Sequence, residues 1–297
     1  MGIIQKYRDK LYLKQWGLGY LKADIKDIIR NRQTNLSFTW LSIENPDVSY
    51  ADPFMFKAAD GKIHVLFENV TSYDMDGTIS LMVCDELFKP VLQKTVLDNL
   101  EHLSYPYVYQ KNGTTYVFPE NAFKGALHCY EYDLNSKAFV NPRKVLDQPV
   151  IDSTILKYDN KYWLFCTMLG EELNSALHIF YANDLLGPYQ PHAGNPVKKA
   201  LNGSRPAGNF IEVDGQLYRP TQNCANYYGE SITINKVTQL TETEFEEEEY
   251  MIIESNPADE FNYGIHTINA IDNLIIVDGQ KAHFQPLRQI SRRLKRF

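Results

Sequence analysis

The amino-acid sequence predicts an all-β fold, a five-bladed β-propeller. A short pattern recurs five times: a two-residue turn, a strand, and a polar or hydroxyl-bearing residue seven positions after the turn. The turn residues are 52, 47, 55 and 58 positions apart, and a period of about fifty with strand–turn–strand content is typical of propellers and other repeat folds. The copies run from Asp60-Gly61 to Glu68, from Asn112-Gly113 to Glu120, from Asp159-Asn160 to Thr167, from Asp214-Gly215 to Gln222, and from Asp272-Asn273 to Gln280.

Turn chemistry and composition support the same fold. Asp-Gly and Asn-Gly pairs tolerate the positive φ angles of tight hairpin turns, so each copy is expected to be a pair of antiparallel strands. The 297 residues include 20 Tyr and 15 Phe, which suit half-buried strands, and the 44% apolar content is ample for a packed core. Apolar runs stay well below the roughly 18 residues of a membrane span. The first ten residues carry charges where a signal peptide needs its apolar region.

Along the chain, residues 3–32 are predicted to be helical, because apolar residues recur there at three- and four-residue steps, although Gly17 and Gly19 interrupt them. Residues 36–43 alternate like a strand, which would complete the last blade and close the ring. The blades are expected near residues 50–100, 103–148, 150–202, 203–256 and 262–285. We therefore expect a helical extension over 1–35, a propeller over 36–285, and a basic amphipathic tail over 286–297.

Charge is distributed unevenly along the chain. The net charge of −7 combines +5 over residues 1–33 and +6 over residues 281–297, which leaves −18 for the middle. An acidic body argues against nucleic acid as a partner. In the tail, Leu287, Ile290, Leu294 and Phe297 share one helical face among five basic residues. Such a segment suits an anionic membrane surface. The alternative is that the terminal helices pack against the propeller or a partner subunit.

Four cysteines, Cys84, Cys129, Cys166 and Cys224, are widely spaced and lack the spacing of a metal site. We expect them to be buried and reduced. This predicts a cytoplasmic protein, peripheral at the inner membrane face if the tail binds lipid. No metal and no cofactor are predicted.

The start of each predicted blade is rich in chemically active residues. Innermost strands of a propeller run along its axis, so the residues that open them converge at one mouth. The ends of the following strands fall at the same end, because hairpin partners are antiparallel. These rules bring together Asp52, Ser104, Tyr105, Asp152, Arg205 and His266 at the strand starts, with Glu68, Glu120 and Gln222 at the strand ends, and add Arg219.

Carboxylates held close together acquire separated pKa values, as glycoside chemistry requires. Arginines suit a carboxylate or phosphate on the substrate, and Tyr105, Tyr107, Tyr227 and Tyr228 suit stacking on sugar faces. The structural alternative is that Asp-Pro and Ser-Tyr-Pro are strand-entry turns and that an Asp–Arg pair holds blades together.

The order of several motifs also resembles a known family. The segments ADPF, LSYPYV with VFPEN, IDST with KYWLFCT, DLLGPYQPHAGNPV, and SRPAGNF with LYRPTQN resemble the N-terminal propeller domain of glucosamine inositolphosphorylceramide transferases and its stand-alone bacterial relatives, over about residues 48–280. That domain is similar to the five-bladed arabinanase/xylosidase and invertase/levansucrase hydrolases. The likeness implies that Asp52 matches their base or nucleophile and Asp152 their auxiliary Asp. Their general-acid Glu lies in a later-blade motif that is absent here, so Glu120 is our candidate. The transferases' glycosyltransferase module is separate and is not within these 297 residues.

We therefore expect a carbohydrate-active, glycosidase-like enzyme that cleaves or transfers a glycosyl unit in cell-envelope or surface polysaccharide metabolism, with a carbohydrate or nucleotide-sugar as its partner. Asp52 would act as base or nucleophile, Glu120 as acid and Asp152 as orienter. The alternative is a non-catalytic glycan-binding or scaffold propeller. An open pocket with carboxylates roughly 5–10 Å apart favours the enzyme, whereas carboxylates consumed in ion pairs favour the scaffold. The substrate-binding residues would be Tyr105, Arg205, Arg219, Gln222 and His266.

Overall fold

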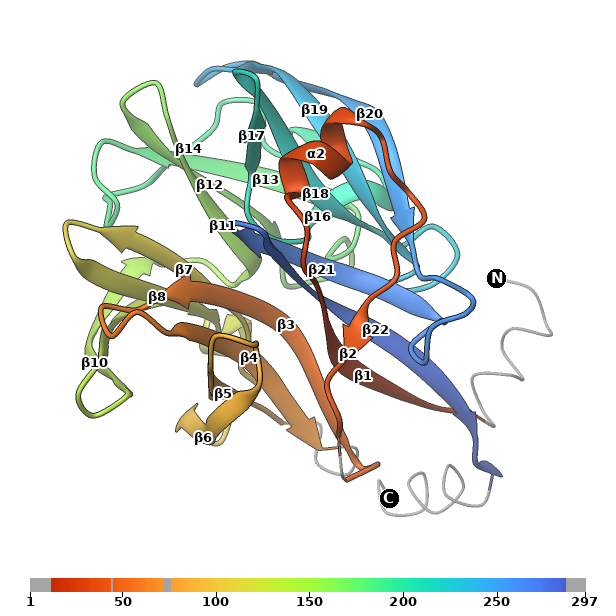
Figure 1. Ribbon diagram of the computed structural model, residues 1–297. Helices are drawn as coiled ribbons and strands as arrows, with labels where there is room; N and C mark the ends of the chain where they lie inside the picture. Colours follow the sequence, from red (N-terminus) through yellow and green to blue (C-terminus); the bar gives the residue numbers. More distant parts are fainter. Residues whose placement is uncertain (1–11, 44, 72–75, 287–297) are drawn as a thin grey trace.

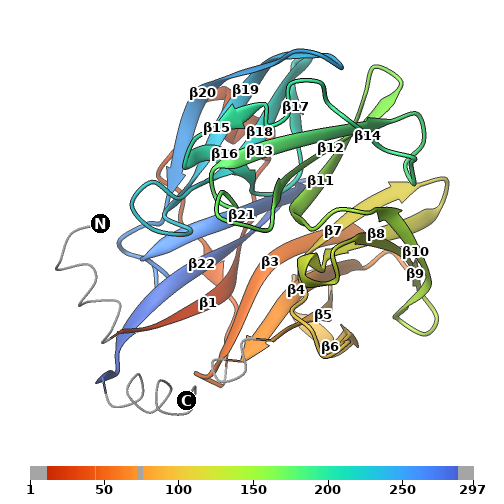
Figure 2. The ribbon, with the colours of Figure 1, turned by 180° about the vertical axis from the view of Figure 1, so that it is seen from behind.

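The computed structural model describes residues 12–43, 45–71 and 76–286 of the chain. Five antiparallel sheets are arranged around one axis (Figures 1 and 2). Neighbouring blades contact one another in a closed ring, from blade one through blade five and back to blade one. The prediction of an all-β, five-bladed propeller is therefore confirmed.

Blades one and two are regular four-stranded meanders. Their inner two strands meet at the predicted Asp60-Gly61 and Asn112-Gly113 turns, where Gly61, Asn112 and Gly113 have positive φ. Blade one consists of β3 (Val48–Lys57), β4 (Ile63–Thr71), β5 (Gly77–Cys84) and β6 (Pro90–Leu97). Blade two consists of β7 (Ser104–Lys111), β8 (Thr114–Glu120), β9 (Leu127–Asp133) and β10 (Ala138–Leu146), with the short 3₁₀ helix η1 (Ala122–Lys124) after β8.

Blades three and four each carry one additional short strand. Blade three contains β11 (Val150–Tyr158), β12 (Lys161–Met168), β13 (Ala176–Ala182), β14 (Gln190–Pro191) and β15 (Lys198–Lys199). Blade four contains β16 (Asn202–Pro206), β17 (Ile211–Val213), β18 (Gln216–Asn223), β19 (Ser231–Leu240) and β20 (Phe245–Glu254).

Blade five joins the two ends of the chain. Its inner strands are β21 (Gly264–Ile271) and β22 (Leu274–Phe284), and its outer strands are β1 (Tyr12–Leu21) and β2 (Thr39–Trp40), in the order β21-β22-β1-β2. β2 lies within the predicted strand 36–43 and does complete the last blade. The main closing strand, however, is β1, which pairs with β22 over its whole length.

The prediction of a helical extension over residues 1–35 is wrong for residues 12–21 and holds only for residues 25–30. β1 is extended, and the helix is limited to α2 (Ile25–Arg30), which Asp24 caps through a hydrogen bond from the Lys26 N–H. In β1, Leu13, Gln15 and Gly17 alternate as buried residues with half-buried neighbours, which is the period of a strand. The apolar spacing of residues 12–21 is compatible with a helix and with a strand, and pairing with β22 favours the strand.

Two glycines explain how closely this pair of strands packs. Gly17 and Gly279 face each other in the β1–β22 register. A Cβ atom on Gly17 would lie 2.3 Å from the Phe261 ring, and one on Gly279 would lie 2.2 Å from the Trp40 ring. The Phe261 and Trp40 rings therefore occupy the space that side chains at positions 17 and 279 would fill.

We expect Gly279→Ala to lower the free energy of unfolding by about 1–3 kcal/mol, because a methyl group overpacks this site. Urea unfolding measures the change. Gly194→Ala is the matched control, since its nearest neighbour would lie at an ordinary 3.4 Å. Equal stability of the two variants would contradict this account of the closure.

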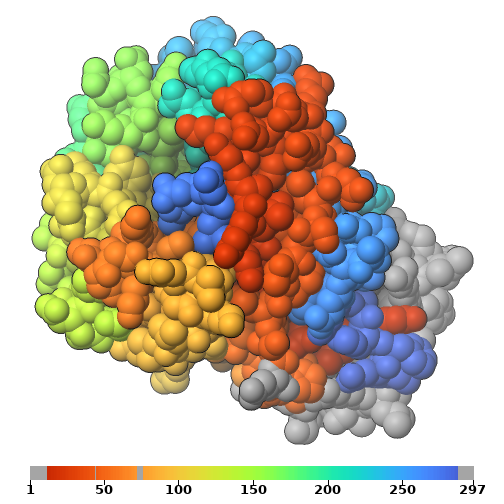
Figure 3. Space-filling model, in the orientation of Figure 1, coloured from red at the N-terminus to blue at the C-terminus, as the bar shows by residue number. Residues whose placement is uncertain are grey.

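α2 covers the end of the propeller away from the strand starts that predict the site. Its buried Ile25, Ile28 and Ile29 pack with blade-four and blade-five residues in one apolar cluster. In Figure 3 the red and orange residues around α2 lie on the surface beside the blue residues of blade five. The helix therefore packs on blades four and five at the end of the propeller opposite the site.

The remaining predictions on the termini and cysteines have different outcomes. All four cysteines are buried and unpaired, as expected. The amphipathic tail 287–297 lies outside the described residues. Within the described ranges, no helix has the length and apolar character needed to cross a bilayer.

Candidate functional site

The site is built on a shared irregularity of the inner strands. In all five blades the register between the first two strands shifts near the start of the inner strand. In blades one to three the shift places Asp52, Tyr105 and Asp152 at positive φ angles of 50°, 40° and 51°. Bulges of this kind redirect a side chain and store local strain. Because the bulge recurs in each blade, side chains at the same place in different blades are directed toward the propeller axis.

A pocket of about 570 Å³ opens at this end of the propeller. It brings together predicted residues that span more than two hundred positions. Among those lining it are Asp52, Glu68, Glu120, Arg205 and His266. These five side chains, expected at one mouth of the propeller, thus line one pocket.

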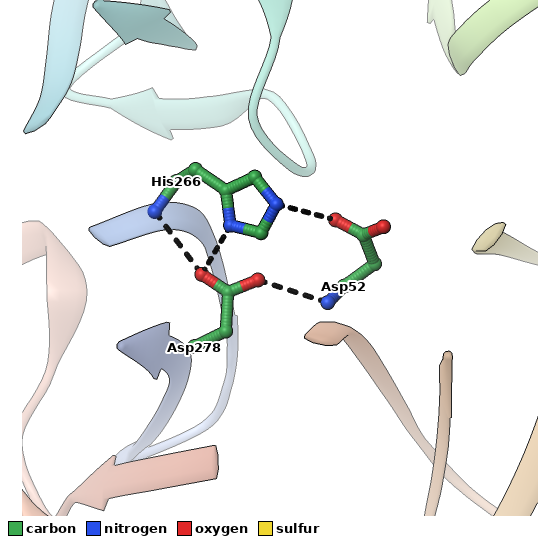
Figure 4. A group of neighbouring side chains, drawn as sticks. All are labelled: Asp52, His266 and Asp278. Carbon is green, nitrogen blue, oxygen red and sulfur yellow. Dashed lines mark hydrogen bonds and ion pairs between the residues drawn. The ribbon is translucent and has the colours of Figure 1, made fainter. Parts of the chain in front are cut away.

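A buried histidine joins two aspartates on one side of the pocket (Figure 4). His266 lies 2.7 Å from Asp278 Oδ1 through Nδ1 and 3.5 Å from Asp52 Oδ1 through Nε2. The Nδ1 contact is an ion pair without hydrogen-bond geometry. Asp278 instead accepts hydrogen bonds from the backbone N–H groups of Asp52, His266 and Thr267. It therefore fixes the backbone at both strand starts.

The charges of this cluster are set by burial and by one another. Burial raises the pKa of Asp52 to about 6; Asp152 and Asp278 add to the shift, and His266 opposes it. Burial alone would lower the pKa of His266, but the carboxylates of Asp278 and Asp52 outweigh it and raise that pKa to about 9. At neutral pH, Asp52 is therefore mostly ionised and His266 is protonated.

A second network surrounds Asp152. Its Oδ2 accepts hydrogen bonds from Arg205 Nε at 2.5 Å and from Gln222 Nε2 at 2.7 Å. Its backbone N–H donates to Glu120 Oε2 at 3.0 Å. Arg205 also donates to Asn174 and lies over the Tyr228 ring. Asp152 and Gln222 thus support the pocket from behind, since neither is among the residues that line it.

Two further carboxyl groups face the pocket with pKa values well above the ordinary range. For Glu120 the cause is burial, followed by the neighbouring Asp152, while Arg205 opposes the shift. For Glu68 the cause is burial, followed by the charge of Asp52. His102 Nε2 lies 3.7 Å from Glu68. Burial therefore favours the protonated form of both glutamates.

Two of the predicted binding residues are placed elsewhere. Tyr105 is fully buried below the pocket, where its hydroxyl contacts Thr154 and accepts from the Gly208 N–H. Arg219 is 1% exposed and pairs with Glu247. Neither lines the pocket, contrary to expectation.

The reason for the placement of Arg219 is its position in the strand. It stands three residues before Gln222, so the two side chains point to opposite faces of β18. Gln222, at the repeat position seven residues after the turn, reaches the Asp152 network. Arg219 instead packs toward Phe165 and Phe245, between blades three and four.

The sequence reasoning missed two residues of the site. Asp278 lies five positions after its turn, where the other copies have Leu66, Phe118, Phe165 and Pro220. A carboxylate at a position that is Leu, Phe or Pro in the other copies could have identified Asp278 as a candidate site residue. Trp16 lines the pocket from β1 and was hidden by the helical prediction for that segment.

Asp52, His266 and Asp278 also form the one group of potential metal ligands found among the described residues, with ligand atoms within 4.8 Å of one another. Direct contacts occupy these atoms: His266 Nδ1 touches Asp278, and both Asp278 oxygens accept backbone hydrogen bonds. Their arrangement is that of an ion-paired cluster.

The solved structures that resemble this chain share its propeller fold. An exo-β-1,3-galactanase from Clostridium thermocellum has a TM-score of 0.57 at 14% identity, covering 83% of this chain and 64% of that one. A family 117 glycoside hydrolase from the marine bacterium Zobellia galactanivorans has a TM-score of 0.56 at 13% identity, covering 93% of this chain and 92% of that one. A family 43 β-xylosidase/α-arabinofuranosidase from a compost metagenome has a TM-score of 0.56 at 16% identity, covering 79% and 90%.

Sequence relatives are more specific. Glucosamine inositolphosphorylceramide transferase 1 of Oryza sativa subsp. japonica is 33% identical over 208 residues, which is 68% of this chain and 28% of the relative. The protein of the same name from Arabidopsis thaliana is 32% identical over 228 residues, 73% of this chain and 29% of the relative. The chain thus spans less than a third of these relatives' length. Residues 38–269 match the family described as glucosamine inositolphosphorylceramide transferase 1, N-terminal, and the chain therefore belongs to this family.

Proposed function

We propose that this protein is a carbohydrate-active enzyme that cleaves or transfers a glycosyl unit in cell-envelope or surface polysaccharide metabolism. The observation that carries the proposal is the convergence of Asp52, Glu68 and Glu120 on one open pocket beside Arg205 and His266. The family membership and the glycosidase-like fold support it.

The two key carboxyl groups have complementary protonation states. Glu120, whose protonated form is favoured by burial and by Asp152, would donate its proton to the leaving glycosidic oxygen as that bond breaks. Asp52, ionised at pH 7, would take a proton from the attacking water or acceptor hydroxyl as the new bond forms. Asp152 would orient this pair through its backbone N–H to Glu120 and its ion pair with Arg205.

Charges of both signs surround the pocket: Lys14 and Arg205 are among the residues that line it, and the loops at its mouth are rich in acidic residues. The mouth lies where inner strands begin and second strands end, and the described loops there contain ten acidic residues and one basic residue, Lys124. Arg205 is already paired with Asp152, and Arg219 is remote, so the expected pair of anion-binding arginines is not available in the pocket. The acidic residues are Asp47, Asp76, Asp98, Glu101, Asp147, Glu171, Glu172, Glu230, Asp259 and Glu260.

A non-catalytic glycan-binding or scaffold propeller is the second candidate. The observation that favours it is the state of Asp152, which is 1% exposed and fully engaged by Arg205 and Gln222. In this reading the pocket binds a glycan and the networks hold the blades in place.

A glycan array combined with a nucleotide-sugar turnover screen tests the proposal directly. We expect the wild-type chain to consume a glycoside or nucleotide-sugar and Asp52→Asn to bind it without turnover. Glycan binding that survives in both proteins without turnover in either would support the scaffold. Absence of both binding and turnover in the wild type would contradict the carbohydrate assignment.

We expect a bell-shaped dependence of kcat/KM on pH. Activity should rise as pH increases through about 6, because the base Asp52 must lose its proton. It should fall at higher pH as Glu120, whose pKa is raised well above the ordinary value, loses the proton that it must donate. Initial rates between pH 4 and pH 10 check this. Activity that is highest below pH 5 would contradict the assignment of Asp52 as the base.

A further inference from the structure

The wall of the pocket formed by blade five has features that the proposed acid–base pair does not use. Trp16 on β1 and Gln280 on β22 are directly paired in the register of the two strands. Both line the pocket. The same wall continues through His266 on β21, so it combines residues from the start and the end of the chain.

Trp16 is held firmly in place. Its ring stacks on His266 with centroids 4.1 Å apart, and it meets the Tyr228 ring edge-on at 6.3 Å. Gly229 makes this position possible, because a Cβ atom there would lie 2.6 Å from the indole. Trp16 remains only half-buried, so part of its ring surface is open to a ligand. A fixed aromatic surface of this kind suits the apolar face of a sugar ring.

Gln280 has an unsatisfied acceptor. The residue is 3% exposed, and its side-chain Oε1 finds no hydrogen-bond partner among the described residues. An unpaired buried carbonyl of this type is costly, so it calls for a donor from outside the chain. Because Oε1 itself has almost no accessible surface, a rotation of the Gln280 side-chain amide is needed to bring it to a hydroxyl or N–H group on a ligand in the pocket.

We propose that Trp16 and Gln280 form a sugar-binding subsite, in which a glycosyl ring packs on Trp16 and donates a hydroxyl or acylamino hydrogen to Gln280 Oε1. The inference rests on the proposed carbohydrate function and adds the residues that select the ring. Sugars that lack a donor at that ring position would be discriminated against, because the Gln280 carbonyl would stay unpaired.

The test uses the full chain and a panel of methyl glycosides of xylose, arabinose, glucose, galactose and N-acetylglucosamine, with binding measured by saturation-transfer NMR and tryptophan fluorescence. For the glycoside that binds best, Gln280→Met should weaken affinity about tenfold, in line with one lost hydrogen bond. Trp16→Phe should weaken binding and remove the ligand-induced change in fluorescence, since Trp163 is buried in blade three and Trp40, on β2, packs against Phe261 and does not line the pocket.

Gln93→Met and Trp163→Phe are the matched controls. Gln93 lies on the outer strand of blade one and bonds to Tyr50, away from the pocket. Both controls should bind like the wild type, and melting curves establish that each variant is folded. A fluorescence change in the wild type that persists in Trp16→Phe would overturn the subsite without reference to Gln280, which keeps the test decisive should Gln280→Met fail to fold.

The two proposals fail differently. If glycosides bind, and Asp52→Asn blocks turnover, but Gln280→Met and Trp16→Phe bind as the wild type does, the subsite is overturned and the proposed function stands. If no glycoside of the panel binds the wild type and no glycan or nucleotide-sugar is turned over, both are overturned.

Discussion

Replacing Asp52 with Asn is expected to reduce turnover by roughly 10²–10⁴-fold, the usual contribution of a general base. The melting temperature should change little. Burial raises the pKa of Asp52, which means that its charged form is less favourable in the folded protein than in the unfolded chain. An uncharged amide avoids that cost and can still accept the hydrogen bond that Thr267 Oγ1 donates to Oδ1 at 2.8 Å.

Thr267→Val is the matched control, because it removes this hydrogen bond and leaves the carboxylate in place. We expect a much smaller loss of turnover from it than from Asp52→Asn. Steady-state kinetics and thermal melting separate the outcomes. A large stability loss in Asp52→Asn with residual turnover intact would identify Asp52 as a structural partner of His266 rather than as a base.

Replacing Arg219 with Met is expected to lower the free energy of unfolding by about 3–5 kcal/mol, the usual result of removing one partner of a buried ion pair. Its Nε and Nη2 atoms donate to the two Glu247 oxygens at 2.8 and 2.6 Å, and Nη2 also donates to the Gly203 carbonyl. Without Arg219, the buried Glu247 carboxylate would keep only Lys198, at 2.7 Å. Ligand binding in the pocket should be unchanged.

Lys236→Met is the matched control for this variant. Lys236 pairs with Glu248 on the same two strands, β19 and β20, but both side chains are substantially exposed. Its loss should therefore cost less than about 1 kcal/mol. Adding Glu247→Leu to Arg219→Met should restore most of the stability. Lost glycan binding in a stable Arg219→Met protein would instead place Arg219 in the site.

The same pair gives a pH signature. Burial alone would raise the pKa of Glu247, but Arg219 and then Lys198 outweigh burial and lower it below the ordinary 4.5. Because the folded pKa is the lower one, the stabilisation is present above pH 4.5 and is lost as pH falls through the folded value. Urea unfolding of the wild type should show this loss in acid, whereas the double variant should lack it.

The sequence was informative for the parts of the fold that belong to the five-fold repeat. Five turns at regular spacing sufficed to predict the blades and the mouth, because hairpin geometry leaves little freedom in where Asp52, Glu120 and Arg205 can point. The acidic run 246–249 lies on β20, the outer strand of blade four, where Glu247 turns inward to Arg219.

The sequence was not sufficient to predict segments whose structure depends on pairing with distant strands. Residues 12–21 have apolar residues at helical spacing, but β22 offers ten partners, among them Gly279 opposite Gly17, and both glycines face aromatic rings from elsewhere in the fold. Nothing within the segment reveals those partners. The burial of Tyr105 and the role of Asp278 likewise follow from neighbours on other blades.

The meeting of β1 and β22 in one blade gives the order of synthesis a consequence. The ribosome makes Trp16 264 positions before Gln280, so their wall of the pocket cannot exist until nearly all of the propeller has been made. In a nascent chain, β1 stays without its partner strand β22 until more than 250 further residues have been made. A truncated product would leave this strand as an unpaired edge, open to adventitious pairing and proteolysis. The pocket is therefore formed only in chains whose synthesis has reached β22.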